Sequence, residues 1–216
     1  MYLSRLILNP RSWSVRRDLA HPYEMHQAIM RAFPQNLKLT EERVLWRVDE
    51  HPRTKAPALL VQSQSLPDWS WLEGERGYLL PVDEPNPAAK PLNLQLTVGQ
   101  TLGFRLLANP TFKTKSNGRP VRQGILKEED QRAWLVRKAE ASGFRFLSVR
   151  LSPYSLVKGG EIQEGDKKHA THFLAVQFDG ILQVTDPARL IQAVQTGIGS
   201  GKGFGFGLLS LAPVRS

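Results

Sequence analysis

One order of strand-like and helix-like patterns occurs twice, and this repeat constrains the fold more than any other feature of the sequence. The order is strand, helix, strand, strand, helix, strand, and in the first half it falls on residues 2–9, 22–33, 43–49, 58–64, 68–72 and 78–82. In the second half it falls on residues 101–108, 127–142, 144–151, 170–178, 186–196 and 204–211. A βαββαβ order is typical of the ferredoxin-like (RRM-like) fold. We therefore expect an α+β protein with two tandem ferredoxin-like domains.

Prolines separate the two halves. Pro85, Pro87 and Pro91 lie close together, which is typical of a linker. The sequence therefore predicts an N-terminal domain over 1–84, a linker over 85–98 and a C-terminal domain over 99–216. Residues 10–21 are expected to form a loop, and residues 158–168 are expected to belong to a long hairpin.

Composition narrows the possible functions. The chain has no cysteine, so disulfides, thiolate metal sites and cysteine nucleophiles are excluded, and a reducing compartment is indicated. No signal-peptide pattern and no apolar run of 18 residues occur, so we expect a cytoplasmic protein with no membrane contact. The net charge of +9 favours a polyanionic partner such as nucleic acid.

The positive charge is concentrated near the middle of the chain. Residues 85–127 contain no acidic residue and seven basic ones: Lys90, Arg105, Lys113, Lys115, Arg119, Arg122 and Lys127. Four of these seven lie in residues 111–123, whose Ser-Asn-Gly-Arg-Pro centre predicts a flexible loop. The loop either binds a phosphate backbone or is a solvated loop that is basic only by chance.

The sharpest candidate for chemistry is the pair Tyr23 and His26. Their spacing of three places both on one side of the first turns of the predicted helix, at the edge of its apolar stripe. A partly exposed histidine beside a phenol can transfer protons to and from the oxygens of a phosphodiester. Arg31 and the pair Arg16 and Arg17 could then bind the phosphate. The alternatives are a boundary pair without chemistry and solvated surface arginines.

A glycine-rich segment near the C-terminus is a second candidate. Residues 197–207 contain six glycines and Lys202, and such a backbone can approach a phosphate closely. The spacing does not fit a P-loop, and the segment follows a predicted helix, so an ATPase or dehydrogenase is disfavoured. Tight backbone packing is the alternative. His169 and His172 lack companions at metal-ligand spacing, so we expect neither a metal nor a cofactor.

Four segments together resemble the CasE family, the CRISPR repeat-RNA endoribonucleases of the type I-E Cascade complex. These segments are residues 1–8, residues 16–26 (Arg-Arg-Asp-Leu-Ala-His-Pro-Tyr-Glu-Met-His), residues 104–110 (Phe-Arg-Leu-Leu-Ala-Asn-Pro) and the glycine-rich residues 197–213. The resemblance covers essentially the whole chain. It implies two ferredoxin-like domains, cleavage of precursor CRISPR RNA at the base of the repeat hairpin, and continued attachment to the product beside other Cascade subunits.

The resemblance also implies a mechanism and residue roles. The 2′-hydroxyl would attack the neighbouring phosphate and leave a 2′,3′-cyclic phosphate and a 5′-hydroxyl. His26 falls on the family's catalytic histidine, and Tyr23 matches a tyrosine beside it. The family's RNA-facing loop corresponds to Gly199, Gly201, Lys202 and Gly203, and the element that grips the RNA stem corresponds to the hairpin with Lys158, Lys167 and Lys168.

Two other functions fit the same patterns. The chain could be a non-catalytic RNA-binding subunit of a ribonucleoprotein complex, with His26 a boundary residue. It could also be a metabolic or regulatory ferredoxin-like protein that binds a small anion at the glycine-rich segment. Loss of cleavage but not of binding in His26→Ala would distinguish a nuclease from the non-catalytic RNA-binding subunit. Salt-sensitive RNA affinity would argue against the small-anion-binding protein.

Overall fold

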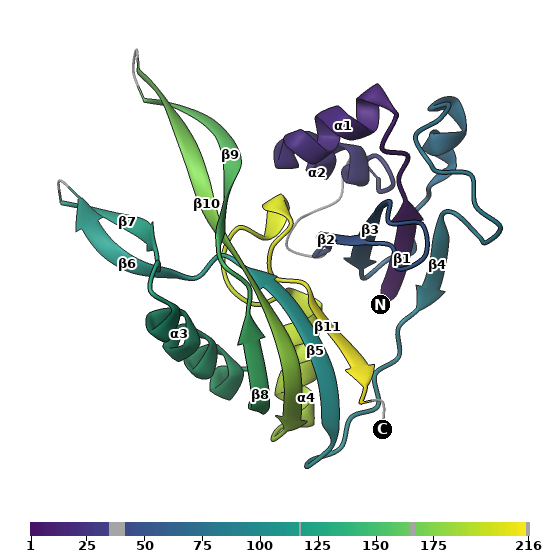
Figure 1. Ribbon diagram of the computed structural model, residues 1–216. Coiled ribbons are helices and arrows are strands. Elements are labelled where there is room, and N and C mark those ends of the chain that lie inside the picture. Colours follow the sequence, from purple (N-terminus) through teal and green to yellow (C-terminus); the bar gives the residue numbers. More distant parts are fainter. Residues whose placement is uncertain (35–41, 117, 165–166, 215–216) are drawn as a thin grey trace. The chain divides into compact units, whose positions relative to one another are not determined.

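Antiparallel strand pairs build the two large sheets of this protein, as a computed structural model shows (Figure 1). The structure describes residues 1–34, 42–116, 118–164 and 167–214, with the side chains of all of these except 116, 119, 160–164 and 167–171. The first elements are β1 (Tyr2–Ile7), α1 (Trp13–Ala20), α2 (Pro22–Met30), β2 (Leu45–Glu50), β3 (Pro57–Ser63), the 3-10 helix η1 (Ser70–Gly74) and β4 (Ala88–Pro91). The later ones are β5 (Thr101–Ala108), β6 (Thr111–Ser116), β7 (Arg119–Gly124), α3 (Glu128–Ala141), β8 (Phe144–Leu151), β9 (Ser155–Glu164), β10 (Lys167–Val184), α4 (Pro187–Thr196), η2 (Lys202–Phe204) and β11 (Leu209–Pro213).

The chain divides into two compact units. Unit 1 contains residues 1–93, 158–170 and 203–205, and unit 2 contains residues 94–157, 171–202 and 206–216. Unit 1 therefore includes two short stretches from the second half of the sequence. The domain boundaries that the sequence suggests, at 84 and 99, stay a prediction.

Unit 1 has a four-stranded antiparallel sheet in the order β2-β3-β1-β4. Read in the opposite direction, from β4 to β2, the strand order is 4-1-3-2. This is the order of a ferredoxin-like βαββαβ unit. The core lies where Leu6, Trp46 and Leu59 of the sheet meet Met25 and Ile29 of α2. These two residues are four apart, so the apolar stripe predicted for this helix is the face that packs on the sheet.

Unit 2 repeats the arrangement with the sheet order β11-β5-β10-β8, again antiparallel throughout. Helix α3 packs on this sheet, and its Trp134 stacks on Phe178 of β10 with ring centroids 6.1 Å apart. Helix α4 begins at Pro187, and the side chain of Asp186 accepts a hydrogen bond from the backbone N–H of Arg189, as expected for an N-cap. The two sheets confirm the predicted α+β fold with tandem ferredoxin-like units.

Several local predictions were wrong. Residues 10–21 are not a loop, because α1 occupies most of them; its exposed Trp13 and buried Asp18 invert the usual apolar pattern. Residues 78–82 form no strand, and only Leu79 makes an isolated bridge, to Leu8. The edge strand is instead β4, inside the proline-rich segment expected to be a linker. Proline is tolerated there because an edge strand has one side without a partner strand.

The second half holds two further corrections. Residues 111–123 are not a flexible loop but the hairpin of β6 and β7, which turns at Gly118 with a positive φ of 76°. Figure 1 shows this hairpin as an arm that extends away from the sheet of unit 2. The closing strand is shorter than predicted, because the glycine-rich residues before Leu209 form η2 and a turn. Among the described helices, none is both long enough and apolar enough to cross a membrane.

Candidate active site

His26 lies in the middle of α2 and is half buried. The helix starts at Pro22, a residue that fits the first helical position, and Met25 and Ile29 bury its inner face. His26 follows Met25 directly, so its imidazole leaves the helix at the border between core and surface. The backbone of Gly203, also in unit 1, lies against this imidazole: a Cβ atom at Gly203 would be 3.9 Å from Nε2.

Burial sets the charge of His26. It lowers the pKa of the imidazole below its ordinary value of 6.5, because the charged form loses water that the protein does not replace. Within the described residues, the buried Nδ1 atom has no hydrogen-bond partner. The imidazole is therefore neutral at pH 7 and able to accept a proton.

Tyr23 lies one turn before His26 and is 54% exposed. Three helical residues separate the two by about 60° around the axis, so they leave the same side of α2. The structure therefore brings the two predicted catalytic residues to one surface, where a phosphodiester could contact both.

Arg31 leaves α2 in another direction. Five residues after His26, it lies about 140° further around the helix axis. Its Nη1 atom donates to Glu75 Oε1 at 3.0 Å, and its guanidinium carbon is 4.0 Å from the ring centroid of Trp71. The structure does not bring Arg31 to the side of the helix that carries His26.

Arg17 and Arg31 lie together at a different cavity. Arg17 donates from Nε to Oδ1 of the buried Asp18 at 2.9 Å, and this hydrogen bond is the main reason that the pKa of Arg17 is raised. Arg16, one residue earlier on α1, is exposed. The cavity has a volume of about 370 Å³ and is lined by Ser14, Arg17, Asp18, Glu24, Gln27, Ala28, Arg31, Trp71, Glu75 and Tyr78. Its three carboxylates offset the two arginines, so it does not favour an anion as a set of free arginines would.

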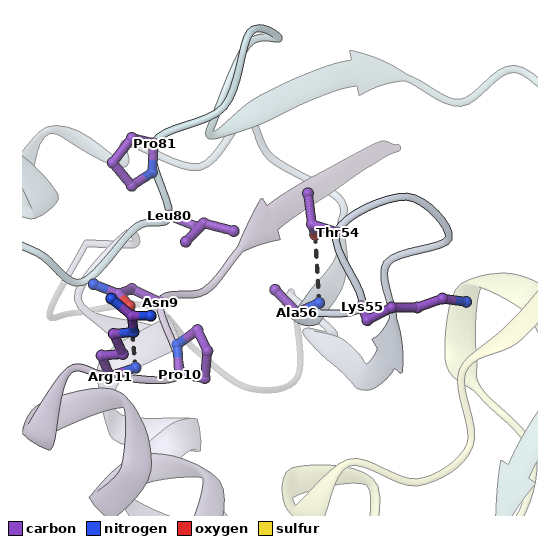
Figure 2. A pocket seen from close by; sticks show the side chains of 8 residues that line it. All are labelled: Asn9, Pro10, Arg11, Thr54, Lys55, Ala56, Leu80 and Pro81. Atoms are coloured by element: carbon purple, nitrogen blue, oxygen red, sulfur yellow. Dashed lines mark hydrogen bonds between the residues drawn. The ribbon is translucent and has the colours of Figure 1, made fainter.

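A second cavity of unit 1, of about 500 Å³, lies away from the predicted catalytic pair. It is lined by Asn9, Pro10, Arg11, Thr54, Lys55, Ala56, Leu80 and Pro81 (Figure 2). In Figure 2 the side chain of Lys55 extends away from Arg11, and its ammonium pairs with Glu50 at 3.1 Å. Neither His26 nor Tyr23 lines this cavity, so the candidate active site is the surface of α2 and not this hollow.

The glycines of the C-terminal segment have different roles. Gly199 and Gly201 have positive φ angles of 90° and 76°, and added Cβ atoms would lie 3.2 Å from Trp134 and 3.0 Å from Phe206. Both positions therefore require glycine for packing, which was the alternative interpretation of the segment. Gly203 has no positive φ and no such close neighbour. Its lack of a side chain leaves the imidazole of His26 uncovered.

Lys202 binds the end of a helix. Its Nζ atom donates to the backbone oxygen of Thr196 at 2.6 Å, in the last turn of α4. An ammonium group is favourable at this position because a helix C-terminus carries a partial negative charge. Lys202 therefore has a structural role within unit 2. An RNA phosphate that bound its ammonium group would have to share it with the carbonyl of Thr196.

The β6–β7 hairpin carries unpaired positive charge. Lys113 lies directly opposite Arg122, and Lys115 lies opposite Pro120 on the same face, since alternate residues of a strand share a face. Among the described residues, none forms an ion pair with Lys113, Lys115 or Arg122. Like charges facing each other destabilise an isolated hairpin, and an anionic partner would remove this cost. The side chain of Arg119 lies outside the described residues.

The remaining basic residues divide into paired and exposed groups. Arg105 on β5 donates from Nε to Asp179 Oδ1 of the adjacent strand β10 at 2.6 Å. Lys158 on β9 is exposed. Lys167 and Lys168 begin β10, and their side chains lie outside the described residues. In the described parts of the chain, no three histidine, aspartate or glutamate side chains gather as metal ligands would.

Sequence reasoning missed the contact between Gly203 and His26, which lie 177 residues apart. No local signal predicts it. Gly203 differs from the other glycines of this segment in its φ angle and in the side chains around it, and a sequence reveals neither.

Comparisons with known proteins cover nearly the whole chain. A family model described as "CRISPR associated protein" matches residues 1–213. The CRISPR-associated endoribonuclease Cse3 of Thermus thermophilus is 38% identical, over 99% of this chain and 100% of the relative. The Cascade subunit CasE of Escherichia coli is 32% identical, over 99% of this chain and 100% of the relative. The structure of Thermus thermophilus Cse3 bound to an RNA representing a pre-cleavage complex matches with a TM-score of 0.82 and 36% identity over 98% of both chains.

Proposed function

Since the chain belongs to this family of CRISPR-associated proteins, we propose that it is an endoribonuclease that binds the hairpin of CRISPR repeat RNA and cuts the precursor at the base of the stem. The product would stay bound, and the protein would act beside other subunits of a Cascade complex, as the name of its relative from Escherichia coli suggests. Its RNA substrate would place this activity in the cytoplasm.

The observation that carries this proposal is the environment of His26. A neutral imidazole at a protein surface, with Nε2 beside a glycine backbone, leaves room for a nucleotide to approach. The likeness to a relative solved with an RNA that represents a pre-cleavage complex supports RNA as the substrate. The exposed Tyr23 on the same side of α2 adds a second polar group within reach of the same phosphate.

The chemistry needs proton transfers at two oxygens. The 2′-hydroxyl of the nucleotide before the cut loses its proton and attacks the adjacent phosphorus, and the 5′-oxygen of the next nucleotide leaves and takes up a proton. This gives a 2′,3′-cyclic phosphate and a 5′-hydroxyl. We assign proton removal from the 2′-hydroxyl to His26, because its lowered pKa keeps it in the accepting form. Tyr23 would donate a hydrogen bond to the phosphate or to the leaving oxygen.

Basic groups would hold the RNA. The unpaired Lys113, Lys115 and Arg122 of the β6–β7 hairpin suit the phosphates of a stem, which proteins recognise mainly through shape and backbone. Arg16 and Lys158 are exposed and free to contribute in the same way. Arg31, Arg105 and Lys202 already have protein partners, so their contribution would require those contacts to be shared or exchanged.

The first test incubates the purified protein in EDTA with a repeat hairpin RNA from its own genome, beside a copy with one 2′-deoxy substitution just before the cut. Cleavage of the first RNA and survival of the second are expected. Binding of both RNAs without cleavage of either would instead support a non-catalytic RNA-binding subunit.

A sulfur substitution at the leaving 5′-oxygen tests the role of His26, because a thiolate leaves without needing a proton. If His26 removes the 2′-proton, this RNA does not restore cleavage by His26→Ala. Restored cleavage would make His26 the proton donor instead.

A further inference from the structure

The solvent face of α1 carries one tryptophan, two arginines and no acidic residue. Trp13, Arg16 and Arg17 are spaced three and four apart, so they leave the same side of the helix. Val15 and Asp18 leave the opposite side and are buried. Trp13 is 67% exposed, although tryptophan is among the residues with the most apolar surface to bury.

A buried anchor holds this tryptophan in place. Asp18 is 1% exposed; its Oδ2 accepts a hydrogen bond from the Tyr78 hydroxyl at 2.8 Å, and its Oδ1 accepts one from Arg17 Nε at 2.9 Å. The guanidinium carbon of Arg17 is 5.3 Å from the ring centroid of Trp13. Arg17 is thereby fixed between a buried carboxylate and the indole. A ring ordered in advance loses less conformational entropy when a ligand stacks on it.

We propose that Trp13 is a stacking platform for one unpaired base of the RNA beside the hairpin, and that Arg16 binds the phosphate next to that base. This inference rests on the proposed RNA substrate. Arg17 lies over one face of the indole and leaves the other for a base, and stacking on an aromatic ring accepts any base. Single-stranded RNA is commonly bound in this way, by aromatic rings with arginines beside them.

The charge of the surface favours RNA over a protein partner. The neighbours of Trp13 on this face are Arg16, Arg17 and Ala20, so the face offers positive charge and no exposed carboxylate of α1, which complements the phosphates of RNA. The net charge of +9 points in the same direction.

The test compares two RNAs that carry a 2′-deoxy substitution at the cut and therefore stay intact: the hairpin alone, and the hairpin with unpaired flanks on both sides. Affinities are measured for the full-length wild type, Trp13→Ala, Trp13→Phe and the control Leu66→Ala, which removes another exposed apolar side chain of unit 1. We expect the wild type to prefer the flanked RNA. Trp13→Ala should weaken binding of the flanked RNA about tenfold and leave the hairpin alone unchanged, because a base stacked on an aromatic ring contributes roughly that much.

Trp13→Phe should keep most of the affinity for the flanked RNA, and Leu66→Ala should keep all of it. An equal loss for both RNAs in Trp13→Ala, or no loss for either, overturns the platform while leaving the proposed nuclease intact. Unchanged RNA affinity with weaker retention of co-purified protein subunits also overturns it and makes the face a protein surface. If the wild type binds neither RNA, both the proposed function and the stacking platform are contradicted.

Discussion

Replacing Gly203 by alanine tests the geometry of the candidate active site without touching a catalytic side chain. The new methyl carbon would lie 3.9 Å from Nε2 of His26 and 4.0 Å from both Cδ2 and Cε1. Nearly equal distances to three ring atoms place the methyl over one face of the imidazole, at its Nε2 edge. These distances are ordinary van der Waals contacts, so the fold accepts the methyl, but the space beside Nε2 becomes smaller.

The two effects of this substitution have opposite signs. Gly203 has no positive φ, so alanine should stabilise the protein by about 0.4–1 kcal/mol through the unfolded state, which raises the melting midpoint by about 1–4 °C. Nε2 accepts a proton in the plane of the ring, so a methyl over the ring face does not cover the lone pair but narrows the space for the nucleotide, and a displacement of the nucleotide by about 1 Å can cost a hundredfold in rate. Single-turnover cleavage should therefore fall about 10–100-fold.

The assay pairs single-turnover cleavage with thermal melting, and Gly74→Ala is the matched control. Gly74 also lacks a positive φ, and a Cβ atom there would meet nothing within 4 Å. We expect both variants to melt at or slightly above the wild-type midpoint and only Gly203→Ala to lose activity. Wild-type cleavage by Gly203→Ala would refute an approach of the nucleotide across the ring face that Gly203 leaves open. A clearly lower melting midpoint would refute the inference that alanine can adopt the backbone conformation of Gly203.

Four further predictions concern His26 itself and two other parts of the structure. His26→Ala should lower single-turnover cleavage by about 10²–10⁴-fold while RNA affinity is retained; an equal loss of affinity would contradict a catalytic role. Burial lowers the pKa of His26, and the proposed base acts when neutral, so the wild-type rate should rise with pH and level off with an apparent pKa below 6.5; a plateau reached only above that value would argue against it. Tyr78→Phe removes a hydrogen bond from the buried Asp18 and should lower the free energy of unfolding by about 1–3 kcal/mol in chemical denaturation, whereas an unchanged value would show that Asp18 does not need it. Lys113→Gln combined with Arg122→Gln should reduce the slope of log affinity against log salt by about 1.5–2; an unchanged slope would place the hairpin away from RNA phosphates.

The periodic elements of this fold were predictable from the sequence because their patterns are local. Helix α2 has apolar residues at Met25 and Ile29 behind a proline, and the strand pair β2 and β3 has a hairpin order. Helix α4 has Asp186 as its N-cap and Gly197 as its C-cap, as the sequence signals predict. Each of these signals acts within a few residues.

The elements that the sequence did not reveal owe their form to tertiary contacts. Helix α1 buries Asp18 because Tyr78, sixty residues later, supplies a hydrogen bond to it. The backbone of Ile7, in β1, is held by the side chain of Asn86, whose Oδ1 and Nδ2 atoms bond to Ile7 N and O at 2.8 and 2.9 Å. This contact lies just before β4, in a segment whose prolines alone predict a linker.

The candidate site also has features that local sequence predicts and features that only tertiary contacts set. The spacing of Tyr23 and His26 predicts a shared helix side, because three residues of a helix always span nearly one turn. The partners of Arg31 and Lys202 could not be foreseen, since Glu75 and the carbonyl of Thr196 reach them only in the folded chain. The same holds for Arg105, whose partner Asp179 is set by the register of β5 and β10.

The sequence by itself determined the βαββαβ order, the basic charge and the pair of residues suited to proton transfer, because composition and periodicity are properties of the chain before it folds. Only the tertiary structure decided which charges are free to bind an anion and which side chains face the same space. It paired Arg17 with Asp18, left Lys113 and Arg122 facing each other, and brought Gly203 against His26. The physical reason is that burial and ion pairing depend on neighbours distant in sequence, whose positions are fixed only when the sheets and helices pack.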